Sequence, residues 1–222
     1  NSNNFLDYAF ARNFALNESL AAGFIDLATT YSDRGQTVTA ISILEKAAAS
    51  KPPKFVTRFS NDFDLKLVDL YRRNNQPDKA LSVIKTIIEQ SSGRAMQKEH
   101  FVAAQLFEQT NDYAEAAKHY YEAGKWSGAV SEKQSAKFIR KAIDCANRPD
   151  VLDKSVLLKA YLALCSFVER KNLSEGLILR ERALSLMMDT DPEKPMQVSA
   201  IAYIKGELNK QNATSKDAAK KS

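Results

Sequence analysis

The chain has 222 residues, of which 44% are hydrophobic, so it can bury a substantial core. Its 7 glycines and 6 prolines are few for this length, which argues against an all-β fold with many tight turns and favours an all-α fold. The formal net charge of +5 raises the question of nucleic-acid binding, but part of the excess lies in C-terminal lysines and the other charges are mixed in sign, which disfavours it.

Helical periodicity of apolar residues runs through most of the chain. Residues 3–17 have a broad apolar face and predict an N-terminal helix. A framework then recurs four times, in which an aromatic residue is followed nine positions later by a small residue. The pairs are Tyr31 with Ala40, Tyr71 with Ala80, Phe107 with Ala116, and Phe167 with Gly176. Such an internal period predicts stacked two-helix units instead of one closed core.

Turn and capping residues give the bounds of these units. Gly35, Asn74–Pro77, Asn111-Asp112 and Lys171-Asn172 separate the two helices of successive units. Ser131 with Gln134 forms a capping box for an extra helix at about 131–146. We therefore predict one domain over residues 1–210, with units at about 21–54, 61–94, 97–130 and 157–190, a capping helix at about 194–208, and a disordered polar tail at 211–222.

The four units resemble the tetratricopeptide repeat (TPR), a helix-turn-helix unit of about 34 residues. The third unit matches the residue pattern of this repeat nearly as well as the first unit does. The second unit matches the pattern less well, and the fourth has Arg180 where the pattern has an apolar residue. The intervals between units are 40, 36 and 60 residues, so the inserted helix interrupts the register. The resemblance implies an all-α, right-handed superhelical solenoid of about four repeats. The first unit matches the family pattern in order, with Phe24, Leu27, Ala28, Tyr31, Ala40, Leu44, Ala47 and Pro52.

In this family, the first helices of successive repeats line a concave groove that holds a peptide or a partner helix, so the resemblance implies a protein partner. Phe101 and Tyr161 are the candidate anchors, because aromatic side chains carry much of the binding energy at interfaces. The chaperone-tail clamp of one subclass is disfavoured, since only Lys98 fits it, and self-association stays open. Carried over by position, the groove is lined by Ile25, Thr29, Leu65, Asp69, Arg72, Lys98, Phe101, Gln105 and Tyr161.

No catalytic constellation is apparent in the sequence. His100 and His119 fall on separate helices, and neither has a partner at a persuasive metal-ligand spacing. Gly124-Lys125 lacks the glycine-rich loop and the strand that a P-loop requires. We therefore expect a non-catalytic scaffold or adaptor without cofactor or metal.

Two alternatives stay open beside the scaffold. The chain begins with Asn1 and not with Met, so it reads as a processed or trimmed product and is compatible with a regulatory or sensing domain of a larger protein. A nucleic-acid-binding protein would use a basic face and show salt-sensitive binding. The residues of that face would be Lys51, Lys54, Arg58, Arg72 and Arg73.

Membrane insertion and disulfide bonding are both disfavoured. No segment approaches the roughly 20 consecutive apolar residues that span a bilayer, which leaves a soluble protein of the cytoplasm or an exported one open. Two cysteines are too few for a disulfide framework. On consecutive antiparallel helices, Cys145 and Cys165 would lie on the order of 12 Å apart along the helix axes, so we expect two buried free thiols.

Overall fold

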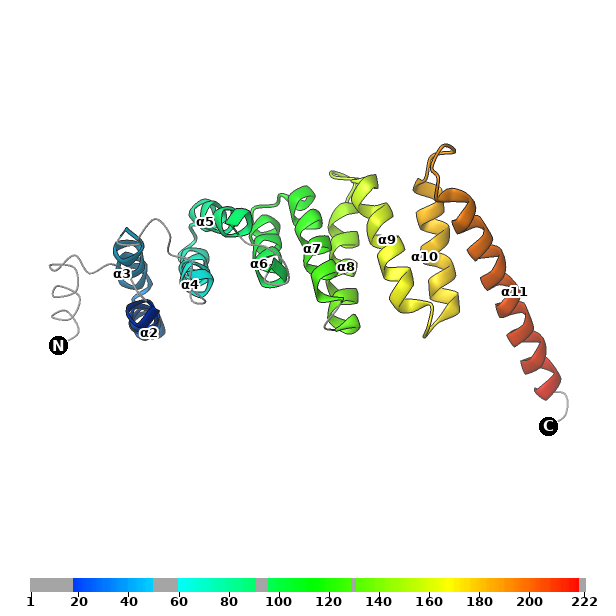
Figure 1. The fold of residues 1–222 in the computed structure, drawn as a ribbon, viewed down its shortest axis with the longest axis horizontal. Coiled ribbons are helices and arrows are strands. Elements are labelled where there is room, and N and C mark those ends of the chain that lie inside the picture. Colours follow the sequence, from blue (N-terminus) through cyan, green and yellow to red (C-terminus); the bar gives the residue numbers. More distant parts are fainter. Residues whose placement is uncertain (1–17, 50–59, 91–95, 129–130, 220–222) are drawn as a thin grey trace. The chain divides into compact units, whose positions relative to one another are not determined.

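The computed structural model describes residues 18–49, 60–90, 96–128 and 131–219, and every regular element in them is a helix (Figure 1). The predicted all-α fold is therefore confirmed, whereas the helix predicted at 3–17 lies outside the described residues. The helices are α2 (Glu18–Asp33), α3 (Thr37–Ala49), α4 (Ser60–Arg73), α5 (Pro77–Gln90), α6 (Met96–Gln109), α7 (Tyr113–Ser127), α8 (Glu132–Ala146), α9 (Lys154–Val168), α10 (Leu173–Leu186) and α11 (Lys194–Ala219).

The chain divides into two compact units, residues 1–92 and 93–222. In the first unit, α2 packs on α3, α4 packs on α5, and α4 also contacts α2 and α3. In the second unit, each helix from α6 to α11 packs on the next one in the chain, and α7 also contacts α9. The single domain over residues 1–210 and the right-handed superhelix both concern the arrangement of the two units, and they stay predictions.

The turns inside the first three hairpins share one backbone geometry. Gly35, Asn75 and Asn111 have φ angles of 78°, 54° and 62°, and each lies four positions after the frame aromatic. The residue that follows donates its backbone N–H to the carbonyl of that aromatic at 2.9 Å in all three turns. Glycine and asparagine suit this left-handed conformation, which ends a helix by satisfying its last carbonyls. In the fourth turn, Asn172 bonds instead to the Val168 carbonyl at 2.8 Å.

Side chains link three consecutive helices in both units. The phenol of Tyr71 on α4 donates to Glu45 Oε1 on α3 at 2.6 Å, and Lys79 Nζ on α5 lies 3.2 Å from the same oxygen. The hydrogen bond from Tyr71 lowers the pKa of the Glu45 carboxyl, and burial raises the pKa of Tyr71. Both groups therefore keep the protonation states that the hydrogen bond requires at neutral pH.

The second unit repeats this arrangement with different residues. The phenol of the fully buried Tyr120 on α7 donates to Glu108 Oε2 on α6 at 2.5 Å. Lys141 Nζ on α8 lies 3.2 Å from that oxygen and 5.0 Å from the centre of the Tyr120 ring. In each unit, one carboxylate thus accepts hydrogen bonds from side chains on two neighbouring helices. These bonds fix the positions of the three helices along their axes relative to one another.

Helices α7 and α8 approach each other closely at Gly124. A Cβ at this position would lie 2.6 Å from Ile139 Cγ1 and 3.2 Å from the Ser135 carbonyl oxygen. The buried hydroxyl of Ser135 donates to the Gly124 carbonyl at 2.7 Å. As predicted, α8 begins after Ser131, whose hydroxyl accepts the Gln134 N–H at 3.3 Å. The inserted helix is therefore an integral part of the second unit and is tightly packed on α7.

Arg180, which departs from the family pattern at an apolar position, links three helices. Its guanidinium bonds Glu169 after α9, with Nη2 at 2.8 Å from Glu169 Oε2, and Nη1 lies 2.5 Å from Gln197 Oε1 on α11. The Arg180 and Glu169 side chains are only 18% and 19% exposed. Arg180 therefore forms hydrogen bonds with the side chains of Glu169 and Gln197 at a position where the TPR pattern has an apolar residue.

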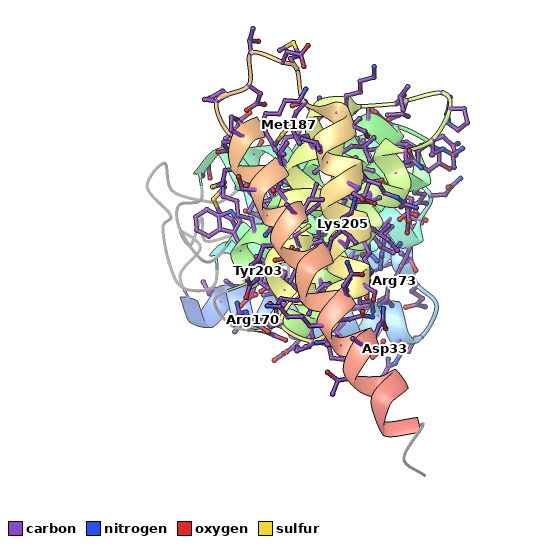
Figure 2. The ribbon with its side chains drawn as sticks, turned by 90° about the vertical axis from the view of Figure 1, so that its right-hand side faces the viewer. Asp33, Arg73, Arg170, Met187, Tyr203 and Lys205 are labelled. Carbon is purple, nitrogen blue, oxygen red and sulfur yellow. The ribbon has the colours of Figure 1, made fainter. Side chains whose placement is uncertain are left out.

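Helix α11 is longer than the sequence predicts. It continues to Ala219, whereas the predicted helix ends at 208 and the predicted disordered tail begins at 211. Residues 209–219 contain neither glycine nor proline and are rich in good helix formers, so nothing in them ends the helix. In Figure 2, α11 lies in front of α10, with Tyr203 and Lys205 labelled along it. Tyr203 is 68% exposed, whereas Ile201 and Ile204 are buried.

The two cysteines are free and buried, as predicted. Burial raises the pKa of Cys145 to about 11 and that of Cys165 to about 12. Both side chains are therefore protonated thiols near neutral pH, and they serve as small apolar residues of the core.

Candidate functional site

A cavity of about 520 Å³ lies between α6 and α8 of the second unit. The half-buried ring of Phe101 packs 4.8 Å from the ring of Phe138 and 6.3 Å from that of Tyr120. An apolar floor with a polar rim is typical of sites that hold a side chain of a ligand. The cavity is lined by Gln97, Lys98, Phe101, Ser131, Lys133, Gln134, Lys137 and Phe138.

A second cavity of about 610 Å³ lies on another side of α8, next to the turn between α9 and α10. Phe167 and Val168 contribute apolar surface to it. Lys133 and Lys137 line both cavities, so α8 forms a wall that the two cavities share. Neither the second cavity nor the role of α8 was predicted from the sequence, where α8 figured only as an interruption of the repeats.

Two carboxylates near α8, Glu132 and Glu175, are engaged by other basic groups. Glu132 lies 3.4 Å from Arg170 and 3.5 Å from Lys171, and Glu175 lies 2.8 Å from Arg140. Within residues 18–49, 60–90, 96–128 and 131–219, no ion pair joins Lys133 or Lys137 to a carboxylate. These two ammonium groups therefore give the α8 surface an excess of positive charge.

The structure places the predicted groove residues in both units. Lys98 and Phe101 line the cavity between α6 and α8, and Gln105 lies one turn further along α6. Ile25 and Thr29 lie on α2 and are partly exposed, with the Thr29 hydroxyl donating to the Ile25 carbonyl at 2.8 Å. Asp69 lies 3.0 Å from Arg72 and 2.8 Å from Arg73.

Two predicted groove residues are buried. Tyr161 is 5% exposed and Leu65 is 8% exposed, so neither side chain is open to a ligand. Tyr161 lies on α9, which packs between α8 and α10 and also contacts α7. The expectation that Tyr161 is an exposed anchor was therefore wrong.

The basic face proposed for nucleic acid is only partly described. Arg72 and Arg73 share the carboxylate of Asp69, which offsets part of their charge. Lys51, Lys54 and Arg58 lie outside the described residues.

His100 and His119 lie against each other, which the sequence reading missed. Their Nδ1 atoms are 2.9 Å apart, so one ring donates an N–H and the other accepts it. His100 is 7% exposed, and His119 stacks on Phe107 with ring centres 5.3 Å apart. A signal was present in the sequence: His100 and His119 lie on the two helices that flank the turn at Asn111, and an antiparallel hairpin brings them to within about one helical turn of the same level.

This pair makes stability depend on pH. Burial lowers the pKa of His100 from its ordinary 6.5, while Glu122 acts in the opposite direction and Lys125 in the same one. The unfolded chain therefore binds a proton more readily than the folded one, and stability falls as the pH drops through about 6.5. We expect denaturant unfolding of α6 and α7 to shift to lower denaturant between about pH 8 and about pH 5. His100→Gln should flatten this dependence, and an unchanged slope would contradict the assignment.

Within the described residues, no helix is both long and apolar enough to cross a membrane.

Comparison with known proteins finds matches of low similarity among solved structures. No protein-family model matches the chain, and no curated protein matches it significantly. Among solved structures, MamA is 16% identical with a TM-score of 0.36, and the match covers 72% of this chain and 93% of MamA. Nearly identical TPR-like repeats of a Podosopora anserina kinesin light chain are 12% identical with a TM-score of 0.35, covering 90% of this chain and 91% of that one. The described residues form an all-α array of helical hairpins, each packed on the next within its unit.

Proposed function

We propose that this chain is a non-catalytic protein–protein interaction scaffold that holds a peptide segment or helix of a partner protein in the cavity between α6 and α8. The observation that carries the proposal is the half-buried Phe101 ring, which lies at the cavity between two helices and rests on Phe138. A partly exposed aromatic ring with a rigid apolar support is typical of the few residues that dominate binding energy.

The rigidity of the cavity supports the same proposal. Phe138 is 4% exposed and Tyr120 is fully buried, so the two rings that contact Phe101 are fixed in the core. The link between Glu108, Tyr120 and Lys141 further fixes α6, α7 and α8 to one another. A preformed cavity spares a bound segment much of the cost of ordering its binding site.

The test is selection of ligands from a displayed library of random peptides on the wild-type chain. Phe101→Ala should weaken binding of the selected peptides by roughly 30-fold, since loss of a central aromatic anchor typically costs about 2 kcal/mol. Val38→Ala is the control, because Val38 is 69% exposed on α3 of the other unit and should leave binding unchanged. Equal binding of the selected peptides by the Phe101 variant and the wild type would contradict the proposal.

A further inference from the structure

Helix α8 presents two ammonium groups between two apolar cavities. Lys133 and Lys137 lie one turn apart on α8 and line both cavities. Phe101 and Phe138 provide the apolar floor on one side, and Phe167 and Val168 provide it on the other. We call the surface of Lys133 and Lys137 the α8 ridge.

The charge on this ridge is not cancelled by the acidic residues around it. The cavity between α6 and α8 has Lys133 and Lys137 in its lining and no carboxylate. In the other cavity, Glu132 and Glu175 are paired with Arg170, Lys171 and Arg140. The remaining acid there, Asp144, is exposed and lies about two helical turns beyond Lys137 on α8. A ligand that crosses the ridge therefore meets an excess of positive charge.

We infer that the partner segment is an acidic peptide that crosses the α8 ridge. Its carboxylates would pair with Lys133 and Lys137, and an apolar side chain on either side would enter each cavity. The inference rests on the proposed function and specifies its ligand class: acidic residues next to apolar ones. Charge complementarity of this kind selects partners and speeds association.

The paired apolar cavities favour a peptide over other polyanions. A nucleic acid would contact the lysines through its phosphates, but it offers no aliphatic side chains for a cavity floored by Val168 and Phe167. An extended peptide presents alternate side chains in the same direction along its length, so it can place apolar groups on both sides of a pair of acidic ones.

Charge reversal on the ridge tests the inference with the peptides selected on the wild-type chain. These peptides should be enriched in aspartate and glutamate beside apolar residues, and their binding should weaken as salt rises from about 50 to about 500 mM. The double variant Lys133→Glu/Lys137→Glu should bind them at least roughly tenfold more weakly. The matched control is Lys154→Glu/Lys159→Glu, which makes the same charge change on exposed positions of α9 in the same unit.

The possible outcomes separate the inference from the proposed function. Selected peptides that depend on Phe101 but are not acidic would overturn the inference and leave the proposed function standing. Selection of no Phe101-dependent peptide would overturn the proposed function itself. Displacement of the peptides from the ridge by a single-stranded oligonucleotide at equal concentration would favour a nucleic acid and overturn the peptide assignment. The wild-type chain could instead self-associate in a concentration-dependent manner that the ridge variant abolishes. The occupant of the ridge would then be a second copy of the chain, through its acidic loop at residues 189–193, and the peptide assignment would be overturned.

Discussion

Replacing Gly124 with valine is expected to lower the free energy of unfolding of the second unit by about 3 kcal/mol, at the upper end of the usual cost of overpacking. A Cβ at this position already falls 2.6 Å from Ile139 Cγ1 and 3.2 Å from the backbone oxygen of Ser135. Because the second atom belongs to the backbone, rotation of a side chain cannot relieve the contact. Helices α7 and α8 would have to separate, which would lengthen the 2.7 Å hydrogen bond from Ser135 to Gly124.

The same substitution at Gly206 is the matched control. Gly206 also lies inside a helix of the second unit, but apart from its chain neighbours and the backbone of its own helix a Cβ there would meet no atom within 4 Å. Gly206→Val should therefore change stability by less than about 0.5 kcal/mol, since valine and glycine differ little in helix propensity. Denaturant unfolding followed by circular dichroism, with hydrogen exchange of α7 and α8 peptides, measures both variants. Equal effects at the two positions would show that α7 and α8 are not in close contact at Gly124.

Replacing Arg180 with leucine is expected to destabilise the end of the second unit by about 3 kcal/mol, because it leaves a mostly buried carboxylate without its cation. Glu169 is 19% exposed and Gln197 is 3% exposed, and both lose their guanidinium partner. Leucine matches the apolar residue of the family pattern at this position. Loss of stability would therefore show that Arg180 belongs to a polar network here and is not a tolerated defect.

Arg140→Leu is the control for this second prediction. Arg140 pairs with Glu175 at 2.8 Å, but the two side chains are 49% and 37% exposed, so the pair is worth less than about 1 kcal/mol. The measurement is the midpoint of denaturant unfolding, with hydrogen exchange of α10 and α11 as a local probe. In the double variant Glu169→Gln with Arg180→Leu, the loss should be smaller than the sum of the single losses. Additive losses would contradict a direct coupling.

Helix positions and turns were readily predicted because they depend on local chemistry. Asp112, Ser131 and Asn172 cap the N-termini of α7, α8 and α10 through their side chains, as expected for these residue types. Gly35 has the positive φ expected after a helix. The end of α11 was not predicted, since a polar composition alone does not distinguish an exposed helix from a disordered tail.

The site was only partly predictable because burial depends on which helices are neighbours. Lys98 and Phe101 line the same cavity from α6, since helical periodicity determines which residues share a face. Tyr161 has the same periodicity on α9, but α8 and α10 cover it. The role of Lys133 and Lys137 follows from the packing of α8 on α7, and that packing depends on the close approach at Gly124.

The three equivalent turns bear on how an internal duplication of hairpins in this chain can be detected. Gly35, Asn75 and Asn111 hold one backbone conformation with two residue types, and the residues after them are glutamine in two turns and aspartate in the third. As duplicated hairpins diverge in sequence, they would lose identical residues before they lose their shared backbone dihedral angles. A history of duplication in such a chain is therefore better detected from backbone torsion angles than from sequence identity.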